Sequence, residues 1–434
     1  MSAVAVFPIV RLASLALPAK GSMAGGPFGS DLVSNDYVSS GVPVVRGTNL
    51  PKNSKFSLDN CVFVTESKAD ALHLNCAHPG DLVFTQRGTL GQVGLIPNDT
   101  PYSRFLISQS QMKMIVDRSK ADPLYIYHYF HLPSTVTYIE NHALRAGVPH
   151  INLGILRRFE IICPPLATQQ KIAAILSAYD DLIANNQRRI TLLERMAEDI
   201  YREWFVRLRF PGYENATIEK GVPQGWRFVE LNELAIINGT NLKKGAAQDR
   251  ICYIDISSVT TNHIDDLTEI ALADAPGRAR RLVRHGDVIW SSVRPANRAY
   301  CLIYEPPKNL VASTGFAVIS PKPDIPFTFI NFAVTSDSFV EQMAMVAKGS
   351  AYPATSFDDF GKAKVLRPSA ELLARFHAQC EPMFRRRHQL RQTNTALAQQ
   401  RDALLPRLIS GKLSVNALDI RFPPGMTRGL ESNS

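Results

Sequence analysis

The sequence predicts an α+β protein with an internal pseudo-twofold repeat. We expect two tandem strand-rich domains, each followed by a long helix, with the two helices packed as an antiparallel coiled coil. Three observations support this fold class. Short apolar runs separated by turn residues fill two long regions. Similar segments recur in the same order about 205 residues apart. Each strand-rich region is followed by roughly 40 residues with helical periodicity.

The repeat is clearest around two Gly-Asp turns. GDLVFTQRGTLG (80–91) contains a turn, an apolar strand and a polar loop with Arg87, and GDVIWSSVRPANR (286–298) repeats this order. RAGVPHINL (145–153) likewise resembles KGSAYPATSF (348–357). These ordered matches share an offset of 202 to 206 residues. Such regularity favours duplication over two unrelated α+β domains with similar turns.

These patterns divide the 434 residues into five segments, and a chain of this length is expected to hold more than one domain. Apolar runs such as VPVVR and DVIWS are bounded by Gly, Pro, Asn and Asp, which is typical of short strands. We expect a first strand-rich domain, a central helix, a second strand-rich domain, a C-terminal helix and a tail, at 1–166, 167–209, 210–368, 369–411 and 412–434.

Both helices carry apolar residues at alternating steps of four and three, the spacing of a coiled-coil seam. The stretch 169–208 contains no Gly or Pro, whereas 370–409 is weaker and Pro382 is expected to kink it or mark its true start. An antiparallel pairing in which residue numbers add up to 580 places Asn186 opposite Asn394. A buried Asn pair fixes register at a cost in stability. A neighbouring heptad register is the alternative.

Composition restricts the classes of function. The net charge of +9 favours an acidic partner such as nucleic acid or a membrane surface. Six scattered cysteines without a CxxC pair argue for a reducing compartment and against a zinc ribbon. HLNCAH (73–78) lacks an evident fourth metal ligand, so no metal site is predicted. Without a signal peptide or an apolar run of spanning length, a cytoplasmic protein is expected.

The sequence contains none of the catalytic motifs that we sought. It has no P-loop, no GxSxG or HExxH, no GxGxxG after a strand, and no Asn/Asp-Pro-Pro-aromatic motif of amino-methyltransferases. Its carboxylate pairs, such as Asp180-Asp181, are adjacent in sequence, so their side chains diverge on a helix. We therefore predict no catalytic residue.

Arginine and amide side chains are the candidate DNA contacts. Arg can donate two bonds to guanine and Asn or Gln can pair with adenine, although phosphate contact is equally compatible with these residue types. The second helix has a net charge of +4, which indicates either a contact along a duplex or a solvated face. The candidates lie at strand ends and on this helix, and are Arg46, Asn49, Gln86, Arg87, Arg294, Asn297, Arg298, Arg385 and Arg386.

Several segments resemble the specificity subunit of type I restriction-modification systems. The most specific are PPLATQQKIAAILSAYDDLI and LLPRLISGKL, and GPFGSDL, VPVVRGTNL, GDLVFTQRG, REWFVRL and PQGWRFVEL are also similar. The resemblance covers essentially the whole chain. The second half departs more, because RPSAELLARFHAQC lacks the PPLxxQ start and contains Pro382.

This resemblance implies a subunit without catalytic activity of its own. Each strand-rich domain would be a target recognition domain for one half of a bipartite, asymmetric site in double-stranded DNA. The helices would set the gap between the halves and dock two methyltransferase subunits, which restriction subunits join. S-adenosylmethionine, ATP and Mg would be used by those partners, with no cofactor bound by this chain.

Two other classes of function remain as alternatives. The first is a DNA-modifying enzyme with an unrecognised active site, which would act without partners. The second is a helical scaffold whose basic charge is incidental, which would show no sequence-selective DNA binding.

Overall fold

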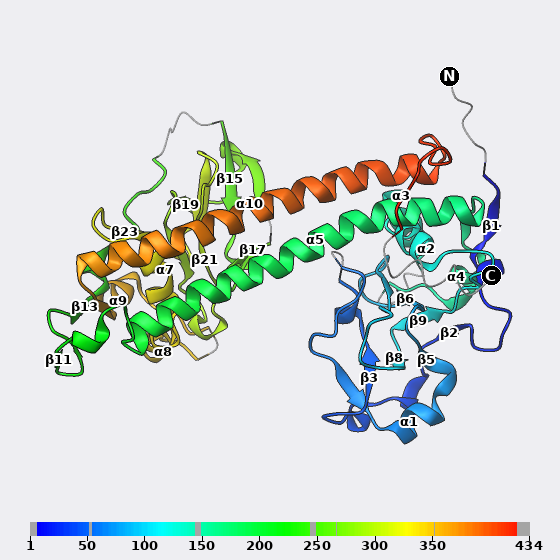
Figure 1. Ribbon diagram of the computed structural model, residues 1–434, viewed down its shortest axis with the longest axis horizontal. Helices are drawn as coiled ribbons and strands as arrows, with labels where there is room; N and C mark the ends of the chain where they lie inside the picture. Colours follow the sequence, from blue (N-terminus) through cyan, green and yellow to red (C-terminus); the bar gives the residue numbers. More distant parts are fainter. Residues whose placement is uncertain are drawn as a thin grey trace. The chain divides into compact units, whose positions relative to one another are not determined.

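The computed structural model describes residues 7–51, 54–143, 149–243, 249–265, 267–350 and 352–422 (Figure 1). The chain forms two compact units. Unit 1 contains Met1–Gln187 and Gln392–Ser434, and unit 2 contains Arg188–Arg391. Each unit therefore combines one strand-rich domain with parts of both long helices. The sequence predicted boundaries between domain and helix at 166/167 and 368/369. These lie close to the first residues of the two long helices, Leu166 and Ala370, and not at the division between the two units.

Two four-stranded sheets form the domain of unit 1. The antiparallel sheet has the order β2, β9, β6, β7, with bounds Met23–Gly25, Gln111–Met114, Leu82–Thr85 and Val93–Leu95. The mixed sheet has the order β4, β3, β8, β5, with bounds Val62–Val64, Val42–Val45, Phe105–Ile107 and Cys76–Ala77. A separate pair joins β1 (Ile9–Arg11) to β10 (Glu160–Ile162). Helices α1 to α4 span Glu66–Ala71, Pro123–Tyr129, Pro133–Asn141 and Leu153–Arg158.

The domain of unit 2 contains the corresponding sheets. Its antiparallel sheet has the order β14, β23, β20, β21, with bounds Ala235–Ile237, Phe316–Pro321, Val288–Ser291 and Tyr300–Leu302. Its mixed sheet has the order β18, β15, β22, β19, with bounds Thr268–Ala271, Arg250–Ile254, Leu310–Ser313 and Ala279–Leu282. Three two-stranded pairs are β13–β24, β11–β12 and β16–β17, with bounds Arg227–Glu230, Lys364–Arg367, Ile218–Glu219, Val222–Pro223, Val259–Thr260 and His263–Ile264. Helices α6 to α9 span Leu231–Leu234, Phe327–Thr335, Asp337–Val346 and Phe357–Lys362.

The two four-stranded sheets have the same strand order in both domains. Both place the strand after the Gly-Asp turn, β6 or β20, inside the antiparallel sheet. Both mixed sheets contain one parallel pair, β3–β8 in unit 1 and β15–β22 in unit 2. In unit 1, β1 pairs with β10, the last strand before the central long helix, and in unit 2, β13 pairs with β24, the last strand before the C-terminal helix. This agreement confirms the internal repeat and the α+β fold class predicted from the sequence.

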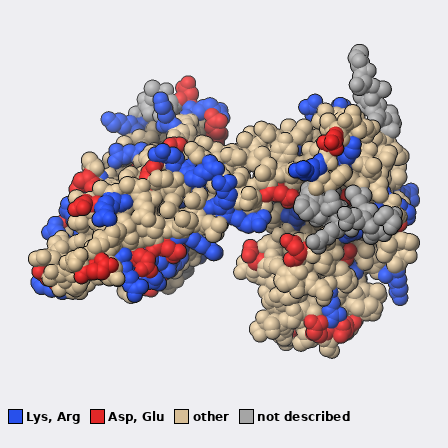
Figure 2. Space-filling view, viewed as in Figure 1, with Lys and Arg blue, Asp and Glu red and all other residues tan. Residues whose placement is uncertain are grey.

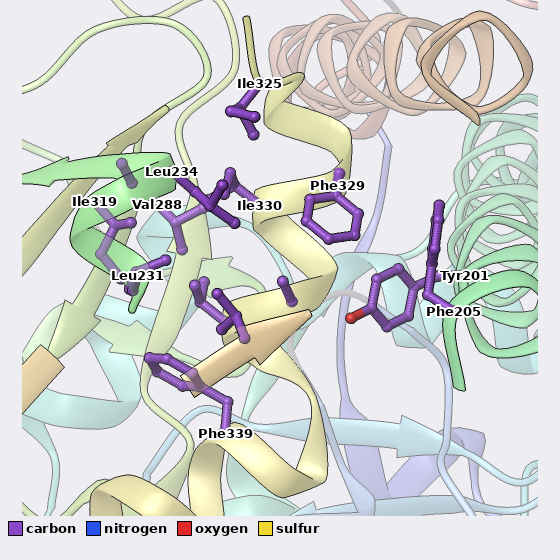
Figure 3. Packing of buried hydrophobic residues seen from close by; sticks show 14 of the residues in the cluster. Tyr201, Phe205, Leu231, Leu234, Val288, Ile319, Ile325, Phe329, Ile330 and Phe339 are labelled. Carbon is purple, nitrogen blue, oxygen red and sulfur yellow. The ribbon is translucent and has the colours of Figure 1, made fainter. Parts of the chain in front are cut away.

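Aromatic and aliphatic side chains from sheet and helices form the main core of unit 2. Figure 3 shows Phe329 and Ile330 of α7 among these residues, with Tyr201 and Phe205 on the helix side and Val288 on the sheet. The rings of Phe205 and Phe329 are 5.1 Å apart and edge-to-face. Burying each such ring stabilises the fold by roughly 1.5–3 kcal/mol. The long helices are therefore part of the domain core and do more than connect the domains.

The start of the central helix is tied to the first domain by a buried glutamine. Helix α5 spans Leu166–Tyr201 and is followed by a π-helical turn, Arg202–Val206. Gln169 is fully buried, and its Nε2 donates to the carbonyl oxygens of Pro164 (2.8 Å) and Lys120 (3.2 Å). These bonds explain the glutamine of the PPLATQ segment, because they fix where the helix leaves the domain.

The C-terminal helix α10 is continuous from Ala370 to Ile409. Pro382 neither starts nor interrupts it, contrary to the expectation from the sequence. A proline inside a helix removes one backbone hydrogen bond. Phe376, Cys380 and Phe384, which flank Pro382, are buried in the core of unit 2. This packing compensates for the missing bond and keeps the helix intact.

The two helices pair antiparallel within each unit (Figure 1, α5 green and α10 orange). In unit 1, Nδ2 of Asn186 donates to Oδ1 of Asn394 at 2.9 Å. In unit 2, the rings of Trp204 and Phe376 are 5.8 Å apart. The residue numbers of both pairs add up to 580. The structure therefore has the register that aligns the two asparagines.

Candidate nucleic-acid interface

Both candidate loops begin from the same buried turn. Oδ2 of Asp81 accepts a hydrogen bond from the backbone N–H of His78, and Oδ2 of Asp287 accepts one from Arg284, each at 2.8 Å. Both aspartates are buried, and this burial raises the pKa of each carboxyl group above its usual value. The repeated Gly-Asp pair therefore positions a strand and has no exposed chemical group to offer a ligand.

The first loop, residues 86–92, is held by backbone bonds on both sides. The N–H of Gln86 donates to Ser110 (2.7 Å), and the carbonyl of Gln86 accepts from Ile151 (3.0 Å). Arg87 forms an antiparallel bridge with His150, and its side chain is exposed. A fixed backbone with an exposed Arg87 side chain suits contact with an external partner.

The second loop, residues 292–299, is anchored by equivalent bonds. The carbonyl of Ser292 accepts from Thr355 at 2.8 Å, and Val293 forms an antiparallel bridge with Ala354. Ser292 and Val293 thus occupy the places of Gln86 and Arg87. The arginines of the two loops are not structural equivalents, although both sequences place an arginine soon after the strand.

Arg294 and Asn297 lie on the exposed part of the second loop. The backbone N–H of Arg294 donates to Pro353 at 2.7 Å. The guanidinium carbon of Arg294 lies 4.5 Å from the ring centroid of Tyr352, a cation–π contact. Tyr352 is 69% exposed. Sequence reasoning missed this tyrosine, although it lies in the repeated segment KGSAYPATSF, and an aromatic residue beside Pro353 was the available signal.

Arg298 has an internal partner. Its Nη2 lies 2.6 Å from Oδ1 of Asp337, the first residue of α8. The side chain of Arg298 is 40% exposed, so it retains a solvent-facing part. The ion pair ties the end of the second loop to the helix.

The structure corrects the assignment of Asn49 as a DNA contact. Asn49 is fully buried, and its Nδ2 donates to the carbonyl oxygens of Ser57 (3.1 Å) and Asp59 (3.2 Å). Its Oδ1 accepts from the backbone N–H of Arg46 at 3.0 Å. These bonds shape the 57–61 loop, and burial removes Asn49 from any duplex. Arg46 is partly exposed, and its guanidinium donates to the carbonyl of Asn60.

The arginines of α10 do not form a stripe of unopposed positive charge. Arg385 is exposed and makes two hydrogen bonds to Glu381, while the exposed Arg386 contacts Gln389 at 3.3 Å. Arg387 is only 8% exposed and pairs with Glu194 of α5 at 3.3 Å. Four of the seven arginines of the helix have acidic partners: Arg385, Arg387, Arg391 and Arg401. Figure 2 shows basic and acidic residues interspersed over unit 2.

No metal or membrane site emerges from the part of the chain that the structure describes. Among these residues, no group of three His, Cys, Asp or Glu side chains could hold a metal ion. Cys76 of HLNCAH is buried, and its thiol contacts the carbonyl of Ala69. Over the same residues, no helix is long and apolar enough to cross a membrane.

The sequence is similar to those of type I restriction specificity subunits. The family model of the type I restriction modification DNA specificity domain matches residues 35–195. The type I restriction enzyme MjaIX specificity subunit of Methanocaldococcus jannaschii is 24% identical over 376 residues, which cover 82% of each chain. The MjaVIII specificity subunit of the same organism is 23% identical over 198 residues, covering 44% of this chain and 45% of that one.

One solved structure shows the same fold over nearly the whole chain. The crystal structure of a type I restriction-modification S subunit from M. genitalium matches with a TM-score of 0.56 and 15% identity. The match covers 96% of this chain and 97% of that chain.

The chain thus contains two copies of one loop-bearing domain, each packed against parts of both long helices. The chain is similar to type I restriction-modification specificity subunits in sequence and in fold.

Proposed function

We propose that this chain is the DNA sequence-recognition subunit of a type I restriction-modification complex and that each unit reads one half of a bipartite target in double-stranded DNA. One observation carries the proposal: two domains of the same topology present different loops at the same place. Because the frames match and the loops differ, the two half-sites should have different sequences. The target is therefore asymmetric.

The proposed contacts differ between the units. In unit 1 they are Arg46, Gln86 and Arg87. In unit 2 they are Arg294, Asn297 and Arg298, with Arg385 and Arg386 as contacts to the phosphate backbone. Arg and amide side chains on a rigid loop can reach base edges in the major groove, whereas exposed arginines on a helix suit phosphates.

The chemistry would belong to partner subunits. The proposed complex contains two methyltransferase subunits and restriction subunits, located in the cytoplasm. S-adenosylmethionine, ATP and Mg would be bound by those partners, with no cofactor on this chain. Similarity to the relatives named above supports this division, because both are specificity subunits.

The direct experiment is reconstitution of the chain with methyltransferase subunits from the same organism. We expect the complex to bind one DNA sequence far more tightly than its shuffled version at physiological salt, by a factor of about 10³ or more. The chain alone should neither cleave DNA nor transfer methyl groups. Robust activity of the purified chain would favour the enzyme alternative. A complex that binds all sequences equally would favour the scaffold alternative.

A further inference from the structure

The second loop contains two arginines with left-handed backbone conformation. Arg294 has φ of +50° and Arg298 has φ of +55°. They flank a short 3₁₀ turn, Pro295–Asn297. Residues other than glycine disfavour this conformation, because their Cβ atom approaches the following carbonyl oxygen. Residues held in this region are concentrated at functional sites. Two of them within five residues therefore need an explanation.

The first loop has glycine at both equivalent positions. The bond from the N–H of Thr85 to Gln92 closes the first loop, and the bond from Ser291 to Ala299 closes the second. Gly88 follows the anchored residue Gln86 by two positions, just as Arg294 follows Ser292. Gly91 precedes the closing acceptor, just as Arg298 does. Both glycines have positive φ, +105° and +83°. The loop fold thus uses glycine in one copy and arginine in the other.

Arg298 has a structural reason for its side chain. Its ion pair with Asp337 attaches the loop to the first turn of α8. The equivalent contact in unit 1 is direct packing, because a Cβ on Gly91 would lie 3.1 Å from the side chain of Val136 on α3. The ion pair of Arg298 accordingly fixes the end of the second loop, and the exposed part of its side chain is still available for contact.

Arg294 has a different environment. Its backbone is fixed by the bond to Pro353, and its guanidinium lies against the exposed ring of Tyr352. An aromatic ring beside a guanidinium restricts the rotamers of the arginine. The hydrogen-bond donors of the guanidinium form a rigid planar fork, which matches the two acceptors of guanine in the major groove. The pair therefore has the features of a preorganised base-reading group.

We propose that Arg294 reads a guanine in the half-site bound by unit 2, with Tyr352 as the positioning residue that orients it. The left-handed backbone at Arg294 is kept because this function needs a side chain where the fold alone would favour glycine. This inference deepens the proposed function and rests on it.

The test uses the reconstituted complex and four variants, Arg294→Gly, Arg294→Lys, Tyr352→Ala and Lys220→Gly. Arg294→Gly removes the side chain and relieves the steric strain of the positive φ at this position. Arg294→Lys keeps the positive charge but loses the planar guanidinium. Lys220→Gly is the matched control, since Lys220 also has positive φ (+51°) but lies in the turn between β11 and β12. Binding is measured to the target and to every single-base-pair substitution of both half-sites. The melting temperature of each complex is measured in parallel.

We expect Arg294→Gly to raise the melting temperature or leave it unchanged. Discrimination should fall about 10- to 100-fold at one G·C pair of one half-site, with the other half-site unaffected. Arg294→Lys should lose most of the same discrimination. Lys220→Gly should leave discrimination intact. Tyr352→Ala should weaken discrimination at that same base pair, by roughly three-fold.

Three outcomes would overturn the inference. Arg294→Gly could preserve discrimination at every base pair, which would make Arg294 irrelevant to recognition. It could weaken binding equally for all sequences, which would make Arg294 a phosphate contact. It could lower the melting temperature while Arg294→Lys keeps full discrimination, which would make the residue structural. The proposed function fails separately, when the wild-type complex itself shows no sequence selectivity.

Discussion

The loop of residues 86–92 and the loop of residues 292–299 are held by equivalent hydrogen bonds, but they expose different side chains. In both, a buried aspartate orders the preceding turn, and a backbone bond from a distant segment holds the first loop residue. The first loop then uses Gly88 and Gly91 where the second uses Arg294 and Arg298. The two copies thus share the hydrogen bonds that hold the loops and differ in the side chains that the loops expose.

The largest effects are expected in the two equivalent strands that lead into the loops, β6 and β20. Phe84 and Trp290 are the third residues of β6 and β20, and both are buried. Replacing either with Ala should lower the free energy of unfolding by about 3–5 kcal/mol, because each leaves a large cavity. Urea denaturation of the two variants measures this. A loss under about 1 kcal/mol in one variant alone would mean that the two strands are not equivalent.

Arg87→Ala tests whether the exposed side chains act independently. We expect about 10- to 100-fold weaker discrimination at one base pair of the half-site bound by unit 1, with the other half-site unchanged. Binding of the reconstituted complex to substituted targets measures this. Gly88→Ala is unsuitable as a control because of its positive φ, so Thr89→Ala, at an exposed neighbouring position, serves instead. Uniform weakening across all sequences would identify Arg87 as a phosphate contact.

The helix pair allows a similar comparison between a polar and an aromatic part of one seam. Asn186→Leu alone should cost about 1–3 kcal/mol, because it leaves the amide of Asn394 without this partner in a half-buried place. The double variant with Asn394→Leu should recover this loss, while the contact of Trp204 with Phe376 continues to hold the seam in unit 2. Chemical denaturation of both variants decides this. Equal losses of unfolding free energy in the single and double variants would show that the hydrogen bond between the two side-chain amides does not contribute to stability.

The smallest effects are expected at the exposed arginines of α10. Neither Arg385→Ala nor Arg386→Ala should change the free energy of unfolding by more than about 1 kcal/mol, because both residues are exposed. Arg386→Ala should reduce the slope of log Kd against log salt concentration by about one, as expected for a lost phosphate contact. Arg385 should contribute less, since Glu381 already neutralises it. Identical slopes in the wild type and both variants would exclude α10 from the interface.

The sequence predicted those parts of the fold that depend on local patterns. Turn residues and apolar runs indicated the strands, and the repeated Gly-Asp pair identified equivalent strands. The continuity of α10 through Pro382 was not predicted, because it depends on the packing of Phe376 and Phe384 in the core of unit 2. Heptad spacing placed Asn186 opposite Asn394, since two seams of similar length leave few registers.

The positions of the two candidate loops were predictable from the sequence, but the surroundings of their side chains were not. The loops after β6 and β20 were identified correctly as loops, and Arg87 and Arg294 are exposed there. The burial of Asn49 was not predicted, because its partners lie in a loop whose path local sequence does not reveal. The acidic partners of Arg298 and Arg387 are distant in the sequence, so composition alone overstated the available positive charge.

One measurement tests most directly the claim that each unit reads its own half-site. The methylated motif is mapped in cells that carry the complete system with wild-type chain, Arg87→Ala or Arg294→Gly. The wild type should give a bipartite, asymmetric motif. Each variant should make the motif degenerate at one position in one half, and the two variants should affect opposite halves. Degeneracy of both variants in the same half, or an unbroken symmetric motif in the wild type, would contradict the account.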